Sequence, residues 1–408
     1  MTCDTDILIV GGGLNGPTLA LALAQSGFRS IVIDANSRPK READTFDGRA
    51  YALARASQKM LAALGLWDAV AKQAQAISEI KASDGHAGRG AAPHFLHFQA
   101  AEMEEGPMGY MLEDRYLRRA LIAAMEANDK ITHLSDSMVV DQSTDGALAE
   151  VTLADGQRLQ GRILIGADGR ASGVAARAGI RRQGWDYGQT ALVCAVKHEL
   201  PHNGIAHQFF MPSGPLAILP LPDNRCSIVW SEKTARAAQI ARANDAEFLK
   251  ALRPAFGDFL GEIELAGVRF SYPLKLTLAE QFIAPRLALV GDAAHGVHPI
   301  AGQGLNLGFR DIGALTEVLH EARLHGEDIA SELVLERYQQ WRRFDTTALA
   351  LGMDTVNRLF SNDNPALRLI RDIGMGLVSA TPALRRGFMR QAAGLTGDLP
   401  RLLQGEAL

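Results

Sequence analysis

The stretch from residue 6 to residue 34, DILIVGGGLNGPTLALALAQSGFRSIVID, decides the fold that the sequence predicts. Asp6–Val10 is apolar after its first residue, as is typical of a strand buried on both faces. Leu19–Ala24 continues as a helix, and Ser30–Ile33 is a second apolar strand. A strand, a helix and a strand in this order predict a parallel α/β sheet.

Glycines occupy the turn between the first strand and the helix. Gly11, Gly13 and Gly16 have the spacing G-x-G-x-x-G. The first would permit the turn, the second would let the backbone approach a pyrophosphate, and the third would let helix and strand pack closely. Asp34 ends the second strand 18 positions after Gly16, near the roughly 20 expected for a carboxylate that binds an adenosine ribose. The pattern predicts a dinucleotide site and does not separate NAD from FAD.

A second glycine-lined loop follows a later strand. Gly291–Asp311 reads GDAAHGVHPIAGQGLNLGFRD and comes after the apolar run Arg286–Val290. Asp292 would therefore lie at the carboxyl edge of the sheet, and a helix is expected from Leu305. Free backbone N–H groups at a helix N-terminus favour negative charge. The loop could hold an anionic ligand or a ring that gains charge on reduction; a tight turn without a ligand is the alternative.

A third strand end carries another acid. The buried run Arg162–Ala167 ends at Asp168-Gly169, so this carboxylate is expected at the same edge. Asp155-Gly156, between alternating segments, instead predicts a hairpin turn.

From Trp185 to Tyr272 short β-type segments alternate with proline-rich turns. This region predicts a mostly antiparallel sheet with one apolar face, suited to covering an aromatic or lipidic ligand.

The bulk composition excludes several classes of protein. The chain has 408 residues, of which 47% are hydrophobic and 22% charged, and a net charge of −4. This balance gives no reason to expect nucleic acid. Cys3, Cys194 and Cys226 are too few for a disulfide framework or a metal site, so we expect no metal and a cytoplasmic location. Ile7–Phe28 lacks charge, but its glycines and Pro17 indicate a buried strand, turn and helix rather than a membrane span.

The C-terminal part is expected to be helical. Ala366–Val378 and Ala383–Ala393 are amphipathic and carry five arginines. Such helices could lie on the anionic inner face of a membrane. Packing on the body of the protein or on a second subunit is the alternative.

The three strand-end signatures in this order resemble those of the flavoprotein aromatic hydroxylases, the FAD monooxygenases of the para-hydroxybenzoate hydroxylase fold. His298–Gly308, HPIAGQGLNLG, is similar to the signature of the ubiquinone-biosynthesis hydroxylases (Ubi/Coq6 type). The similarity extends through Tyr187-x-Gln189, Gly214–Pro220 and Cys226–Trp230. It covers nearly the whole chain and fades after about residue 350.

The resemblance implies an α/β fold, in which a Rossmann-like FAD-binding domain is interleaved with a mostly antiparallel β-sheet substrate domain, plus C-terminal helices. The expected boundaries are 1–75, 109–175 and 275–345 for the FAD-binding domain, 76–108 and 176–274 for the substrate-binding domain, and 346–408 for the C-terminal helical region.

The resemblance also implies which residues bind FAD. Asp292 would bind the ribityl chain, and the backbone of the residues from Gly304 to Asn306 would face the flavin pyrimidine edge. Many relatives carry arginine a few residues after the Asp-Gly pair, where this chain has VAA at 174–176, with Arg170 and Arg177 nearby. The expected cofactor residues are Gly11, Gly13, Gly16, Asp34, Arg49, Arg115, Asp168, Asp292, Gly302, Gly304, Leu305 and Asn306.

The implied activity is hydroxylation of the aromatic ring of a polyprenylphenol intermediate in ubiquinone biosynthesis. It would use tightly bound FAD, NAD(P)H as a transient co-substrate, and O2 through a flavin hydroperoxide. His298 and Tyr187 are the catalytic candidates, and His207 is a further residue expected near the cavity. The partner hypotheses are a prenylated phenol, the membrane surface, other quinone-biosynthesis proteins and a second copy of the chain. A non-quinone aromatic substrate and a non-catalytic flavin-binding subunit are the alternatives.

Overall fold

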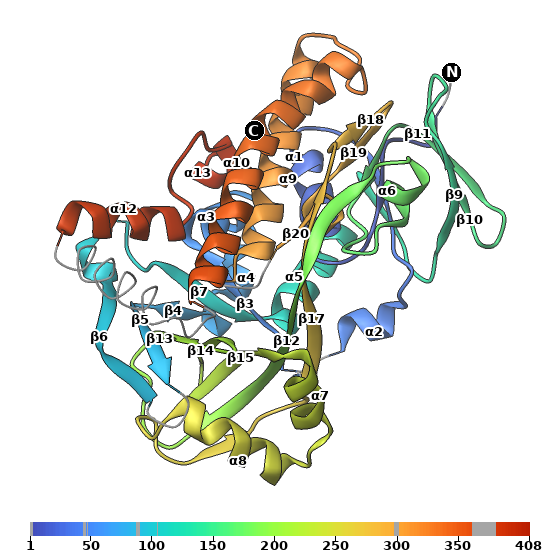
Figure 1. Ribbon diagram of the computed structural model, residues 1–408. Coiled ribbons are helices and arrows are strands. Elements are labelled where there is room, and N and C mark those ends of the chain that lie inside the picture. The colour runs from blue at the N-terminus through green and yellow to red at the C-terminus, as the bar shows by residue number, and fades with distance from the viewer. Residues whose placement is uncertain are drawn as a thin grey trace.

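The computed structural model describes residues 3–43, 46, 48–86, 90–103, 105–297, 302–360 and 381–408. Figure 1 shows an α/β body in the upper part of the view and a second sheet below it. Long strands run from one part into the other, so the chain passes between the two several times.

The first sheet is mainly parallel. Within the described residues its order is β18-β19-β11-β1-β2-β8, with the hairpin of β9 and β10 at one side. β1 pairs in parallel with β2 and β11, β2 with β8, and β11 with β19. The bounds are β1 Thr5–Val10, β2 Ser30–Ile33, β8 Ile131–Leu134, β9 Val139–Ser143, β10 Ala149–Leu153, β11 Arg158–Gly166, β18 Ile283–Ala284 and β19 Leu287–Leu289. The carboxyl ends of β1, β2, β11 and β19 therefore meet at one edge.

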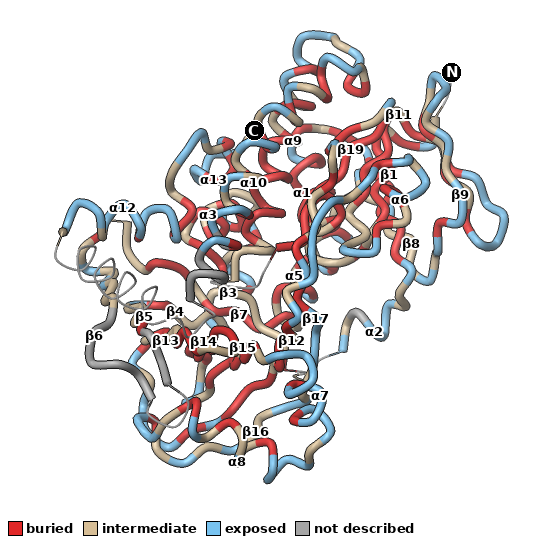
Figure 2. The backbone as a smooth tube through the Cα atoms, viewed as in Figure 1, coloured by how far each residue is buried: buried red, intermediate tan, exposed pale blue. Residues whose placement is uncertain are grey.

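Helices cover this sheet and close its core. β1 and β19 are buried almost completely, as is β11 from Ile163 onward, and Figure 2 shows the red interior of the body. Their continuous apolar runs fit strands that are covered on both faces. The helices of the body are α1 Asn15–Gln25, α2 Arg38–Glu42, α3 Arg55–Ala63, α4 Trp67–Val70, α5 Asp114–Glu126, α6 Gly173–Arg177, α9 Gln303–Leu324 and α10 Glu332–Phe360, with the 3-10 turns η1 Ala71–Gln73, η2 Ala100–Glu102 and η3 Gly291–Ala293.

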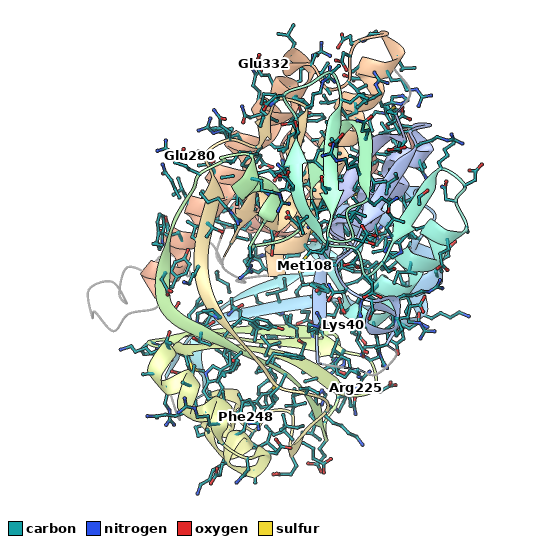
Figure 3. The ribbon with its side chains drawn as sticks, turned by 90° about the vertical axis from the view of Figure 1, so that its right-hand side faces the viewer. Lys40, Met108, Arg225, Phe248, Glu280 and Glu332 are labelled. Carbon is teal, nitrogen blue, oxygen red and sulfur yellow. The ribbon has the colours of Figure 1, made fainter. Side chains whose placement is uncertain are left out.

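The second sheet is mostly antiparallel, as the sequence predicts. Its order in the described residues is β20-β17-β12-β15-β14-β13-β5-β6, with β16 beside β12, and only β13 and β5 pair in parallel. The bounds are β5 Glu79–His86, β6 Gly90–Gln99, β12 Arg182–His198, β13 Ile205–Met211, β14 Gly214–Leu221, β15 Arg225–Lys233, β16 Ile263–Leu265, β17 Phe270–Ala279 and β20 His295–Gly296. Two helices, α7 Thr234–Arg242 and α8 Asp245–Phe256, cover its lower face, where Figure 3 labels Phe248.

A small apolar layer joins the two large sheets. It includes the three-stranded sheet of β3 Ala50–Ala54, β4 Gln75–Ile77 and β7 Gly109–Glu113. Met108 and Met111 are buried there against Ala195, Ala206 and Leu221 of the lower sheet. Figure 3 shows Met108 between the two parts of the molecule.

The C-terminal segment packs partly on the body. It contains α12 Pro382–Ala392 and α13 Arg401–Gln404. Leu402 and Leu403 are buried in the main core, and a Cβ atom at Gly313 would lie 2.6 Å from Leu403 Cδ1. The helix expected at Ala366–Val378 lies outside the described residues. No helix in the described ranges is long and apolar enough to cross a bilayer.

Candidate functional site

The loop after β1 combines two close-packed glycines with an open one. Gly11 has φ +121°, and a Cβ atom there would lie 2.3 Å from the carbonyl oxygen of Ala167. A Cβ atom at Gly16 would lie 1.9 Å from the carbonyl oxygen of Gly11. Around Gly13 no described heavy atom comes within 4 Å of such a Cβ. The close packing of the backbone therefore requires glycine at Gly11 and Gly16, while the space beside Gly13 can receive a ligand.

Asp34 follows β2 and lies against the glycine loop. Its side chain is 2% exposed, and its Oδ1 accepts a hydrogen bond from the backbone N–H of Asn36 at 3.0 Å. A Cβ atom at Gly12 would lie 2.3 Å from Asp34 Oδ2. The carboxylate thus stands at the carboxyl edge of β2, close to the loop that contains Gly13.

The N-terminus of α9 meets the same edge. Gly302 precedes the helix with φ +63°, in the left-handed region that glycine adopts without strain. A Cβ atom at Gly304 would have no described heavy atom within 4 Å, and the side chain of Leu305 packs on the main core. The first turns of α9 and α1 contain no acidic residue. Both helix starts therefore present N–H groups and a positive dipole end to an anionic group.

The side chain of Asn306 fixes this helix start to its neighbours. Its Oδ1 accepts hydrogen bonds from the backbone N–H of Ala54 at 2.8 Å and from the hydroxyl of Ser57 at 2.7 Å. Its Nδ2 donates to the carbonyl oxygens of Ala52 at 2.9 Å and Gly302 at 3.0 Å. All four bonds are internal, so the amide is structural and only the backbone of Asn306 can serve a ligand.

Two further acids lie at the ends of β11 and β19. The Asp168 carboxylate accepts hydrogen bonds from Ser172 Oγ at 2.5 Å and from the backbone N–H of Val174 at 3.0 Å. It therefore orders the start of α6. The Asp292 carboxylate is partly exposed and forms an ion pair with Arg170, Nε to Oδ2 at 3.2 Å. Of the two arginines that the sequence puts near the Asp-Gly pair, Arg170 thus reaches Asp292.

The two arginines expected to contact the cofactor pair with acids around the start of α5. Arg49 Nη2 lies 3.3 Å from Asp114 Oδ2. Arg115 donates from Nε to Glu113 Oε2 at 2.8 Å and stacks on Tyr116, with 4.6 Å from Cζ to the ring centroid. The guanidinium of Arg115 thus lies at the junction of the two sheets.

The catalytic candidates have different surroundings. Tyr187 is partly buried beside Leu276, Val297 and Leu307, and so lies near the segment that leads to the α9 loop. His298 lies outside the described residues. His207 packs against Phe259, with 4.5 Å between ring centroids, and burial together with the charge of Lys81 lowers its pKa to about 4.

The upper face of the second sheet carries a half-buried row of side chains. Val193, Val229, Ala217 and Gln208 are successive cross-strand partners on β12, β15, β14 and β13. Each is only partly buried, whereas alternate residues on the lower face are fully buried against α8. Because Ala195 on the same face of β12 packs toward the body, the row faces the body. His207, one position from Gln208, therefore points away from it.

These features together fit FAD. The glycine loop, Asp34 and two helix starts give one dinucleotide edge, and the apolar row provides a wall opposite it. The FAD binding domain family matches residues 4–350 of the chain. The ubiquinone hydroxylase UbiL of Rhodospirillum rubrum is 42% identical over 99% of this chain and 93% of its own length.

The chain belongs to the FAD-dependent ubiquinone-biosynthesis hydroxylases.

A second relative and a solved structure are consistent with this family assignment for the hydroxylase. The 3-demethoxyubiquinol 3-hydroxylase of Escherichia coli is 38% identical over 96% of this chain and 99% of its own. Among solved structures, the p-nitrophenol 4-monooxygenase PnpA of Pseudomonas putida has a TM-score of 0.80 at 20% identity, covering 97% of this chain and 99% of its own. At that identity the likeness establishes the fold alone, which is that of the FAD-dependent aromatic hydroxylases.

One buried network around the site has no sequence motif that predicts it. Asp311, fully buried in α9, accepts hydrogen bonds from His295 Nε2 at 2.5 Å and Arg342 Nε at 2.8 Å. Arg342 also binds Asp345, Nη1 to Oδ2 at 2.7 Å, and Arg310 binds the same carboxylate at 2.8 Å. Two arginines therefore face two aspartates in this cluster. Asp311 ends the quoted loop, but its role depends on contacts distant in sequence.

Proposed function

We propose that this hydroxylase inserts one oxygen atom of O2 into the aromatic ring of a polyprenylphenol intermediate of ubiquinone biosynthesis, with NAD(P)H as the electron donor. The observation that carries the proposal is the 42% identity with ubiquinone hydroxylase UbiL over 99% of the chain. Bound FAD supplies the electron transfer and the activation of O2. The chain binds and orients the reactants and excludes water.

The residues divide these tasks in the proposal. The open backbone at Gly13 holds the pyrophosphate, Asp34 the adenosine ribose and Asp292 the ribityl chain. The N-terminus of α9, from Gly302 to Asn306, faces the ring, where its N–H groups and dipole favour the charge of a reduced flavin.

The upper face of the second sheet is proposed to hold the substrate. Val193, Val229 and Ala217 present small apolar side chains there, and Gln208 adds a polar group at one end of the row. An aromatic ring with an apolar tail matches such a surface. Tyr187, beside Val297 and Leu307, is the proposed proton-handling residue.

The test uses the purified holoprotein with NAD(P)H, O2 and a prenylphenol. We expect a product heavier by one oxygen atom, in an amount that matches the NAD(P)H consumed. NAD(P)H oxidation that yields only peroxide would contradict the substrate assignment, and a flavin-loaded chain without NAD(P)H turnover would indicate a non-catalytic subunit. Profiling quinone intermediates in a deletion strain checks the pathway: a hydroxylation precursor should accumulate.

We also propose that α12 contacts the surface of an anionic membrane. Leu384 and Phe388 are 45% and 55% exposed and one helical turn apart. The helix contains three arginines and no acid; Arg385 and Arg390 pair with Glu102 and Glu105 of the body, and Met389 is buried. Exposed apolar side chains next to cations favour an anionic lipid surface. Flotation with anionic vesicles should recover the wild-type protein and not the Leu384→Ser/Phe388→Ser variant; equal recovery of both would contradict this contact.

A further inference from the structure

Arg182 connects two loops that the first sheet presents at its carboxyl edge. It is the first residue of β12, and its side chain is half-buried. Its Nη2 donates to the backbone carbonyl oxygen of Asp292 at 2.7 Å, and its Nη1 donates to that of Arg170. One guanidinium therefore binds the loop after β11 and the loop after β19 at once.

A guanidinium suits this task because its N–H groups form a rigid planar fork. Both acceptors are main-chain oxygens, so the two bonds set where the backbones of the loops lie relative to each other. Neither bond involves the Asp292 carboxylate. That carboxylate pairs with Arg170, and the side chains of Arg170 and Asp292 are 48% and 35% exposed. An exposed pair of this kind contributes little and can rearrange when a ligand arrives.

We propose that Arg182 is a positioning residue that holds the Asp168–Arg170 loop and the Gly291–Asp292 turn at the separation that FAD binding requires. The inference rests on the proposed placement of FAD at this edge. It assigns a role to a residue outside the three strand-end signatures.

The position of Arg182 in the chain adds a second consequence. β12 runs for 17 residues and pairs with β17, where Ala279 is opposite Arg182. Arg182 Nη2 also reaches Thr277 Oγ1 on β17, at 3.5 Å. The same strand carries Tyr187 and Val193 farther along. The residue that spaces the cofactor loops therefore belongs to the strand that helps form the substrate face, so its loss should affect both FAD affinity and the coupling of NAD(P)H oxidation to hydroxylation.

The test measures FAD binding to the apoprotein. Arg182→Met keeps most of the side-chain volume but removes all donors, and we expect its Kd for FAD to rise at least about tenfold. Arg182→Lys retains the charge without the fork, so it should give an intermediate Kd. Arg181→Met is the matched control, because Arg181 is the adjacent arginine, 83% exposed, and pairs only with Glu280 at the surface in the described structure. Its Kd should stay within about twofold of wild type.

Thermal unfolding of the apoproteins separates positioning from folding. We expect Arg182→Met and Arg181→Met to unfold at similar temperatures while their FAD affinities differ. An unchanged Kd in Arg182→Met, or a Kd that rises equally in Arg181→Met, would overturn the proposal. If Arg182→Met does not fold, Arg182→Lys decides by the same Kd criterion. A different result would count against the proposed cofactor edge itself: a Gly13→Ala protein that binds FAD as tightly as wild type does.

Discussion

The carboxylate of Asp311 accepts a hydrogen bond from the backbone N–H of Gly291 at 2.9 Å, so the last residue of the glycine-lined stretch holds the first. Gly291 has φ +61°, and a Cβ atom there would lie 2.0 Å from Asn15 Nδ2. The turn that carries Asp292 is thus fixed by a buried charge in α9 and by close packing against α1. Its geometry depends on an ion network that continues into α10 through Arg342.

Replacing Asp311 with Asn should destabilise the protein and change its response to acid. The buried Arg342 would lose one of its two charged partners and keep Asp345, at a cost of about 3 kcal/mol. Burial alone would raise the pKa of Asp311, but the charges and hydrogen bonds of His295 and Arg342 outweigh it and lower that pKa below its ordinary value of 3.8.

The sign of the pH effect follows from linkage. The folded state holds the proton of Asp311 less tightly than the unfolded state, so the stabilisation is present above pH 3.8 and is lost as the pH falls through the folded pKa. Urea unfolding between pH 3 and 7 should show a shallower loss for Asp311→Asn than for wild type. Asp328→Asn, at a partly exposed pair with Arg286, is the control and should cost about 1 kcal/mol or less. Equal effects of the two changes would refute this account.

Alanine at two glycines of the first loop should separate folding from cofactor binding. Gly16→Ala would put a methyl group 1.9 Å from a backbone oxygen and should strongly destabilise the apoprotein. Gly13→Ala would point into open space and should leave apoprotein stability within about 1 kcal/mol. It should nevertheless weaken FAD binding, because the methyl group takes the space proposed for the pyrophosphate. Thermal unfolding and FAD titration measure the two effects; normal FAD affinity in Gly13→Ala would contradict the assignment.

An acid at Gly304 should act in opposite directions on stability and on function. Asp in the first turn of a helix interacts favourably with the dipole, by about 0.3 to 1 kcal/mol. Gly304→Asp should therefore leave the apoprotein as stable as wild type or more so, while the added charge disfavours a reduced flavin and abolishes hydroxylation. An asparagine at this position has nearly the shape of aspartate but no charge. Gly304→Asn should therefore lower the flavin reduction potential less than Gly304→Asp does. Equal potentials for the two variants would argue that the effect is only steric.

Asn306→Ala should destabilise the start of α9. The backbone N–H of Ala54 and the carbonyl oxygens of Ala52 and Gly302 would lose their partner, at a cost of about 3 kcal/mol. Ser57→Ala removes only one of the four bonds and should cost about 1 kcal/mol. Denaturant titration of both apoproteins tests the order; a larger loss for Ser57→Ala would be inconsistent with the network.

Tyr187→Phe tests the proposed proton-handling residue without changing the packing around it. If the hydroxyl acts in the reaction, kcat should fall about 100-fold or more, while KM and FAD affinity remain near wild type. Loss of a purely structural hydroxyl would lower the unfolding temperature and leave kcat unaffected. The measurement is the rate of product formation as a function of pH.

The sequence predicts the strands of the first sheet well where both faces are buried. Ser30–Ile33 agrees with β2 at both ends, and β1 begins one residue before the predicted start. The buried run expected at Arg162–Ala167 is the end of a longer strand, β11, which begins at Arg158. Gly161 lies inside it, paired with Thr5, where a side chain would contact Leu8. A glycine that allows close approach resembles a break in the pattern.

The buried ion network could not be predicted in the same way. Asp311 and Arg342 are 31 positions apart and on different helices. Nothing in the spacing of α10 indicates that Arg342 is among the largest fully buried side chains. Helical periodicity identifies an apolar face, but it does not identify which charged residue on that face will find a partner.

The pairing of β11 with β19 has a consequence for how the chain folds. Gly166 pairs with Leu289, and the strand β19 begins 121 positions after β11 ends. Closing a loop of that length is entropically costly, and parallel pairings of distant segments form slowly. The antiparallel sheet made by the intervening residues shortens the effective connection once it has folded. The edge with Asp292 should therefore assemble late, after the sheet that faces it has formed.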